Sequence, residues 1–186
     1  MSEHFMPLDL KPYFNQKGAT GEGNYGSGGI TLRGLSYPEE EMPFGQPLTV
    51  SSVPFRLERT EAFDHLETMG QICRFPPFKA GAVHILGVGS DGDMTTTLAL
   101  MKGGEIVTEK SFGLTLHMAH EASFDNVCAV ACSKSNMPSG PFPHIQLRLW
   151  AASVLLEEAA DIDSIRFEDH PCIRIFAITL EGAERS

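Results

Sequence analysis

The stretch from Ala82 to Lys110, AVHILGVGSDGDMTTTLALMKGGEIVTEK, constrains the fold of this chain more than any other segment. It predicts three strands, at residues 82–88, 95–101 and 106–110. The dipeptide Gly103-Gly104 joins the last two strands in a hairpin, because glycine adopts the positive φ angles of tight turns. Both faces of the first strand are apolar, which is typical of a strand buried between two layers. A meander with a central buried strand favours a sandwich or a barrel.

The same stretch contains Gly87-Val88-Gly89-Ser90-Asp91-Gly92, a literal G-x-G-x-x-G motif. A dinucleotide site needs a helix after this motif, with its N-terminus facing the pyrophosphate. Here a run of threonines follows, which begins a helix poorly, and two aspartates stand where phosphate would bind. The motif is therefore interpreted as a glycine-rich loop.

The composition limits the classes of partner. The chain has 186 residues and a net charge of −10, without a basic block, which argues against binding to nucleic acid or to an anionic membrane. No apolar run reaches eighteen residues, so no membrane span is expected. The first residues lack the pattern of a secretory signal, and the four cysteines are expected to be reduced thiols. These observations predict a cytoplasmic protein.

Short strands with Gly and Pro punctuation, and no long amphipathic helix, predict a single all-β domain. Residues 50–181 are expected to form the core of a two-sheet antiparallel β-sandwich, with residues 1–49 as an irregular N-terminal segment packed on it. Further local expectations are an edge strand over Val50–Leu57, a turn over residues 76–81, a strand over Ile145–Leu156 and an acidic connector over residues 157–163.

Five segments are spread in order along nearly the whole chain: LDLKPYFNQKG from residue 8, LSYPEEEMP from 35, VPFRL from 53, KAGAVHILGVGSDG from 79 and IRIFAITLEG from 173. Together they resemble the galactose-binding-like β-sandwich (jelly-roll) domains that accompany glycoside hydrolases. The resemblance implies a jelly-roll that binds carbohydrate without catalysing a reaction. It also implies a structural calcium ion near the first loop and the last strand, with Asp9, Asn15 and Glu181 as side chains to test.

The strand expected over Ile145–Leu156 places Gln146, Arg148 and the only tryptophan, Trp150, on one face. Carbohydrate sites use an aromatic ring for the C–H faces of a sugar and planar polar groups for its hydroxyls. We therefore predict that Trp150 stacks on a sugar while Arg148 and Gln146 bind hydroxyl groups. His144 is assigned to the same site, and Tyr25 in the glycine-rich loop over residues 18–29 is assigned to a lid. The alternative is that Trp150 packs beneath a loop and Arg148 pairs with a carboxylate.

Two other classes of function remain open. One is a structural protein that forms homo-oligomers through the sandwich and its N-terminal arm. The other is a cupin-like metalloenzyme that uses His84, His117, His120 or His144, although the order H-x-x-H-E at residues 117–121 matches neither H-E-x-x-H nor H-x-x-E-H. No nucleophile elbow of the form G-x-S-x-G occurs. The sequence therefore predicts a carbohydrate-binding module that is not an enzyme.

Overall fold

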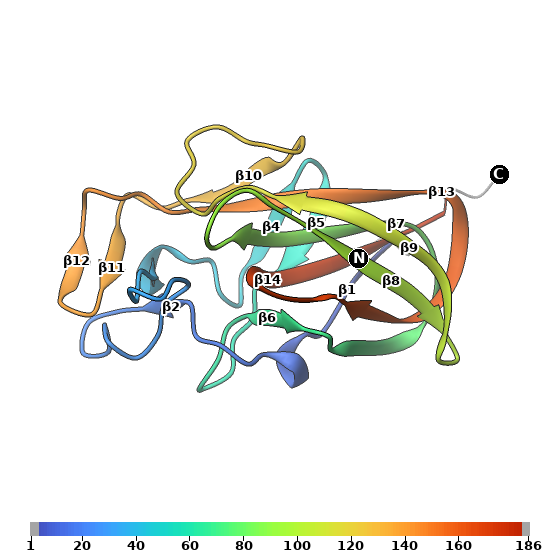
Figure 1. Ribbon diagram of the computed structural model, residues 1–186, viewed down its shortest axis with the longest axis horizontal. Coiled ribbons are helices and arrows are strands. Elements are labelled where there is room, and N and C mark those ends of the chain that lie inside the picture. Colours follow the sequence, from blue (N-terminus) through green and yellow to red (C-terminus); the bar gives the residue numbers. More distant parts are fainter. Residues whose placement is uncertain (1–3, 184–186) are drawn as a thin grey trace.

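The structure, a computed structural model, describes residues 4–183, and its regular secondary structure is almost entirely β-strand (Figure 1). The described residues contain two short 3-10 turns, η1 (Lys11–Tyr13) and η2 (Glu39–Glu41), and no α-helix. The strands are β1 (Phe5–Pro7), β2 (Ala19–Thr20), β3 (Tyr37–Pro38), β4 (Pro47–Val50), β5 (Val53–Arg56), β6 (Leu66–Met69), β7 (Ile72–Gly89), β8 (Met94–Lys102), β9 (Glu105–Leu114), β10 (Val127–Ala131), β11 (Ser135–Met137), β12 (Gly140–Phe142), β13 (Arg148–Phe167) and β14 (Asp169–Gly182). The prediction of an all-β, antiparallel sandwich is confirmed.

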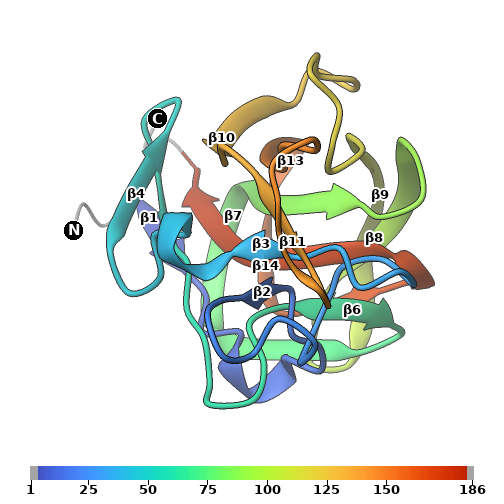
Figure 2. The same cartoon turned by 90° about the vertical axis from the view of Figure 1, so that its left-hand side faces the viewer.

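One large antiparallel sheet runs in the order β1-β14-β7-β13-β8-β9, with β6 beside β14 and β10 beside β13. The first residues of β13 pair with β10 and its last residues pair with β8, so this one strand serves two parts of the sheet. The sheet also curls, because Leu116, just after β9, forms a bridge back to Gly89 at the end of β7. In Figure 2, β4 and β9 lie on opposite sides of the molecule.

Two hydrophobic clusters lie on the two faces of this sheet. Val83 and Ile85 of β7 belong to the first cluster, inside the curl, with residues of β8, β9, β13 and β14. Leu86 and Val88 belong to the second cluster, which lies between the outer face of the sheet and segments from residues 19–57. The central strand is therefore buried on both faces, as its sequence predicts.

The N-terminal segment is part of the fold. β1 pairs with β14, and Leu10 and Phe14 enter the first cluster. Tyr37 is fully buried in the second cluster, and its hydroxyl donates to the carbonyl oxygen of Arg148 at 2.7 Å. Residues 1–49 were predicted to be an irregular segment packed on the sandwich. The described part, residues 4–49, instead contributes side chains to both clusters and so to the core itself. Residues 1–3 of that prediction lie outside the described range.

The hairpin between β8 and β9 is confirmed: Gly103 and Gly104 have φ angles of +58° and +89°. The strand expected over residues 50–57 is instead the end of a hairpin, in which β4 turns into β5. The turn expected over residues 76–81 is wrong, because β7 continues through Pro76 and Pro77. Both prolines fall at a shift in the register with β13, where no ladder hydrogen bond is lost.

The acidic connector expected over residues 157–163 is also wrong, because β13 continues to Phe167 through a bulge at residues 156–159. Ala160 and Ile162 alternate inward within this stretch, while Asp161 faces solvent. The acidic side chains hide an ordinary strand alternation, since only every second residue needs to be apolar. Among the described residues, no helix is long and apolar enough to cross a membrane.

Candidate functional site

The strand face predicted to stack on sugar is closed. Trp150 is 2% exposed and packs in the second hydrophobic cluster. Its indole nitrogen donates to the carbonyl oxygen of Leu116 at 3.1 Å. The ring therefore has no open face, and the prediction that Trp150 stacks on a sugar is wrong. The register explains the burial, because Trp150 pairs with Gly87 of the central strand and with Cys128 of β10.

The other residues assigned to that site lie at the start of β13 and near β12. Arg148 is half-buried and donates from Nη1 to the carbonyl oxygen of Ala119 at 3.3 Å. Gln146 and His144 precede the strand and are exposed, and His144 packs edge-on against Phe142. Tyr25 lies near Gly140 of β12. These side chains lack the aromatic plate that the prediction required of Trp150.

Of the three side chains suggested for calcium, Asn15 and Glu181 lie far apart, and Asp9 accepts from the backbone N–H of Lys11 at 3.1 Å. Asn15 donates to and accepts from the backbone of Glu67, which lies opposite Arg174 on β14. Glu181 lies seven residues further along β14, roughly 20 Å away at the rise of a strand. Its carboxylate already binds His4 and His84, each at 2.8 Å. Asn15 and Glu181 are therefore too far apart to share one ion, and the calcium site itself stays a prediction.

The histidines of the metalloenzyme alternative are also separated. His84 binds Glu181, His117 is buried with Nδ1 near the carbonyl oxygen of Gly89, and His120 and His144 are exposed on different loops. Within residues 4–183, no three His, Cys, Asp or Glu side chains are close enough together to hold a metal ion.

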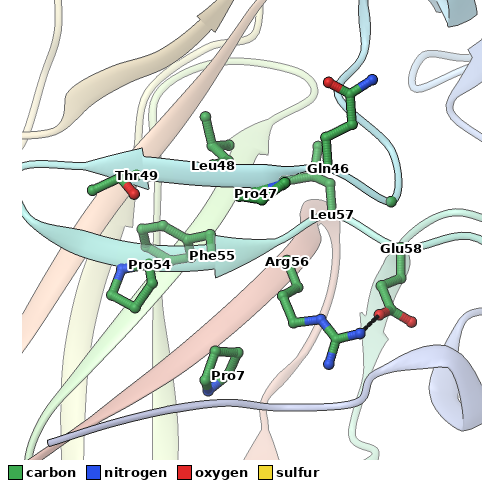
Figure 3. Close-up of a pocket in the computed structure, with 11 residues that line it drawn as sticks. Pro7, Gln46, Pro47, Leu48, Thr49, Pro54, Phe55, Arg56, Leu57 and Glu58 are labelled. Atoms are coloured by element: carbon green, nitrogen blue, oxygen red, sulfur yellow. Dashed lines mark ion pairs between the residues drawn. The ribbon is translucent and has the colours of Figure 1, made fainter. Parts of the chain in front are cut away.

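One groove, of about 310 Å³, lies between β1 and the β4–β5 hairpin (Figure 3). Pro7 and Pro54 line it, and Phe55 and Leu57 beneath them are almost completely buried. Glu58 at its rim pairs with Arg56 at 2.7 Å and with Lys11 at 2.6 Å. The walls are therefore apolar, and these charges at the rim are already paired.

A second hollow, of about 330 Å³, is polar and opens between three loops. We call it the Arg59 hollow; its walls include Lys17 and Asn24 from the glycine-rich segment, Glu39 from η2, and Arg59, Thr60 and Phe63 from the loop between β5 and β6. Phe63 is 41% exposed. A ring with an open face and several planar polar groups therefore share this hollow.

Asp64 fixes the walls of the Arg59 hollow. It is buried, and its two carboxylate oxygens accept from the backbone N–H groups of Gly18 at 2.7 Å and Ala19 at 2.9 Å. It also binds Nδ1 of His65 at 2.8 Å. One carboxylate thus ties the glycine-rich segment to the loop that carries Phe63.

The guanidinium of Arg59 is held in place from two sides. It pairs with the carboxylate of Glu39, and it lies over the ring of Phe44 at 5.3 Å from the ring centre. Thr60 shapes the neighbouring turn, since its Oγ accepts from the N–H of Phe63 at 2.9 Å and its N–H donates to the carbonyl oxygen of Phe63 at 2.8 Å. The polar groups of the hollow are therefore positioned before any ligand arrives.

Comparison with known protein families assigns the chain to one of them. The family model of AziU2-like β-sandwich domains matches residues 3–184, nearly the whole sequence. The chain belongs to the AziU2-like β-sandwich domain family. No curated protein matches it. The family supports the predicted sandwich, while the finer resemblance to galactose-binding-like domains of glycoside hydrolases has no support from this match.

In this AziU2-like domain, Arg59 and Phe63 were not predicted as site residues from the sequence. A signal was present in Arg59-Thr60-Glu61-Ala62-Phe63, a polar loop that carries one aromatic residue with no apolar neighbour at strand spacing. Such a residue is a candidate for a surface contact rather than for the core. Its partners Lys17, Asn24 and Glu39 come from distant segments, so only the fold brings them together.

Proposed function

We propose that this AziU2-like domain binds carbohydrate, and that the Arg59 hollow holds the sugar. The observation that carries the proposal is the meeting of the exposed Phe63 ring with Arg59, Glu39 and Asn24 in one small hollow. An aromatic face packs against the C–H face of a sugar ring. Guanidinium, carboxylate and amide groups bind neighbouring hydroxyls in pairs.

The size and charge of the hollow narrow the ligand class. A volume of about 330 Å³ is at the small end of ligand sites, roughly 300–1,000 Å³, which suits one or two sugar units. Lys17 forms no ion pair with the described residues, Arg59 is paired with Glu39, and the lining also contains the acidic side chains of Glu61 and Asp64. Because acidic groups outnumber basic ones, the hollow favours a neutral sugar, whose hydroxyls can accept charge-assisted hydrogen bonds from Lys17.

The test is thermal unfolding against a panel of neutral and acidic mono- and disaccharides. A sugar at about 100 times its dissociation constant stabilises the domain by about 2.7 kcal/mol, a shift of roughly 5–10 °C for a domain of this size. Phe63→Ala and Arg59→Gln should abolish the shift, while Phe124→Ala, which removes an equally exposed ring from another loop, should preserve it. A shift that survives both hollow variants, or a panel without any shift, would refute this site.

Assembly into homo-oligomers is the second candidate, and one observation favours it. A hollow of about 630 Å³ between β9 and the bulge of β13 combines Val107 with Lys102, Lys110, Glu157 and Glu158. A patch with both charges beside an apolar centre is complementary to itself, as a two-fold interface requires. This interface does not require the N-terminal arm, which packs in the core of its own chain.

Light scattering over a range of protein concentrations tests assembly directly. A dimer whose mass is lost in Val107→Glu supports the β9 face, whereas Thr95→Glu at the far end of the β8–β9 hairpin serves as a matched control. A monomer at every concentration would refute this candidate.

A further inference from the structure

Three polar side chains form a continuous chain of hydrogen bonds on the outer face of the sheet. Oγ of Ser153 on β13 lies 2.9 Å from Nδ1 of His84 on β7. Nε2 of the same ring lies 2.8 Å from a carboxylate oxygen of Glu181 on β14. Neither the apolar groove of Figure 3 nor the Arg59 hollow contains these residues.

The register of three adjacent strands creates this arrangement. Ser153 lies directly opposite His84, and His84 lies directly opposite Thr179, two residues before Glu181. Residues two apart on a strand share a face, so all three side chains project outward. Cross-strand pairs on one face are close enough for direct hydrogen bonds. Three paired strands, and not a loop, therefore hold Ser153, His84 and Glu181 in position.

The hydrogen bonds fix the direction in which a proton moves. An ionised carboxylate only accepts, so Nε2 of His84 carries the hydrogen and Nδ1 of the neutral ring accepts from the hydroxyl of Ser153. His4 donates to the second oxygen of Glu181 at 2.8 Å. Although burial acts to raise it, the hydrogen bonds from His84 and His4 hold the pKa of Glu181 below its ordinary value. The carboxylate thus stays charged and keeps the imidazole in this tautomer.

Exposure differs along the chain of contacts in the way that a nucleophile and its base require. His84 is 4% exposed, whereas Ser153 faces solvent. The base is therefore shielded from competing contacts with water, while the hydroxyl remains accessible to a reagent. An adjacent base oriented by a third group is what activates a serine hydroxyl, whatever the fold.

We infer that Ser153 is an activated nucleophile that accepts an acyl group from an activated ester, with His84 as its general base and Glu181 as the positioning residue. Ser153 Oγ attacks the carbonyl carbon while its proton passes to Nδ1 of His84. The tetrahedral adduct then expels the alcohol, which takes that proton, and an acyl-serine remains. Water releases the acid by the reverse sequence. This inference does not depend on carbohydrate binding at the Arg59 hollow.

An organic phosphorofluoridate, diisopropyl fluorophosphate, tests the nucleophile directly. The Ser153 oxygen–phosphorus bond forms, the phosphorus–fluorine bond breaks, fluoride leaves with the bonding pair, and the proton passes through His84 to water. The rate of adduct formation at each serine is followed by mass spectrometry of peptides. Ser111, an exposed serine on β9 without an imidazole partner, serves as an internal control in the same molecule.

The expected result is labelling of Ser153 at least about 100-fold faster than Ser111, the usual contribution of a general base. Glu181→Gln should reduce the rate at Ser153 at least about tenfold while leaving Ser111 unchanged, since the amide no longer fixes the tautomer. Circular dichroism verifies that this variant is folded.

Two results would overturn the inference. Equal rates at Ser153 and Ser111 would make Ser153 an ordinary surface hydroxyl that bonds a structural histidine. Fast labelling of Ser153 that is unchanged in Glu181→Gln would show that the carboxylate does not position the base. Ser153→Ala must remove the adduct from that peptide, and an adduct of equal yield on a neighbouring residue would assign the reaction elsewhere.

Discussion

The indole nitrogen of Trp150 donates a hydrogen bond to the carbonyl oxygen of Leu116, 3.1 Å away. Leu116 follows β9 and also forms the bridge to Gly89 that returns this part of the chain to β7. The tryptophan therefore joins β13 to the segment that closes the curl of the sheet. Its role in the fold replaces the sugar-stacking role that its position on the strand suggested.

Replacement of Trp150 should therefore affect stability. Trp150→Ala should lower the free energy of unfolding by about 3–5 kcal/mol, as expected for a buried aromatic. Trp150→Phe should cost less, because it keeps most of the packing and loses the hydrogen bond, worth about 1–2 kcal/mol. Urea unfolding followed by circular dichroism measures both, since these variants lack the only tryptophan. An unchanged midpoint for Trp150→Ala would contradict the buried position.

The sequence was sufficient for the β8–β9 hairpin because its signals are local. Apolar strands and the Gly103-Gly104 turn are encoded within thirty residues. The predicted meander is wrong at its first step, because β13 lies between β7 and β8 in the sheet, and a strand that enters from elsewhere in the chain leaves no local signal. The sequence did not reveal that β13 continues past residue 156. The exposed face of this strand around Asp161 is acidic, so the segment looked like a connector. The Arg59 hollow was hidden for another reason: Lys17, Glu39 and Phe63 meet only through buried groups such as Asp64, and sequence spacing carries no information about that meeting.

Stability should fall on mild acidification because of buried histidines. Burial lowers the pKa of His65 and of His117, although a hydrogen bond from each ring opposes the effect. Below the unfolded value of about 6.5, the unfolded chain binds more protons than the folded one. The free energy of unfolding should therefore decrease as pH falls from 6.5, by up to about 1.4 kcal/mol per pH unit for each group.

His117→Asn isolates one of these contributions. The asparagine amide nitrogen occupies nearly the position of Nδ1 and can still donate to the carbonyl oxygen of Gly89, but it does not titrate. Denaturant unfolding between about pH 6.5 and 5 should show a slope smaller by up to about 1.4 kcal/mol per pH unit in the variant. Parallel pH profiles for the two proteins would mean that His117 takes up its proton equally in both states.

Gly113 and Phe124 should be energetically coupled. A Cβ on Gly113 would clash with the ring of Phe124, which covers the glycine. The backbone of Phe124 has a φ angle of +57°. Gly113→Ala should cost about 1–3 kcal/mol, because the ring must move away. In the Phe124→Ala background the same change should cost little. Urea unfolding of the four proteins of this double-mutant cycle gives the coupling, and an equal cost in both backgrounds would rule out the contact.

The turn between β4 and β5 should be improvable. Ser51 and Ser52 have φ angles of +49° and +69°, which this two-residue turn requires and which serine adopts at a cost of about 1 kcal/mol or more each. The double change Ser51→Asn, Ser52→Gly should raise the free energy of unfolding by about 1–2 kcal/mol, since these residues adopt such angles readily. Ser111→Gly, at an extended position in β9, is the control and should destabilise, because glycine weakens a strand. Thermal and urea unfolding measure both variants, and a loss of stability on changing the turn would show that the serines do not hold these angles.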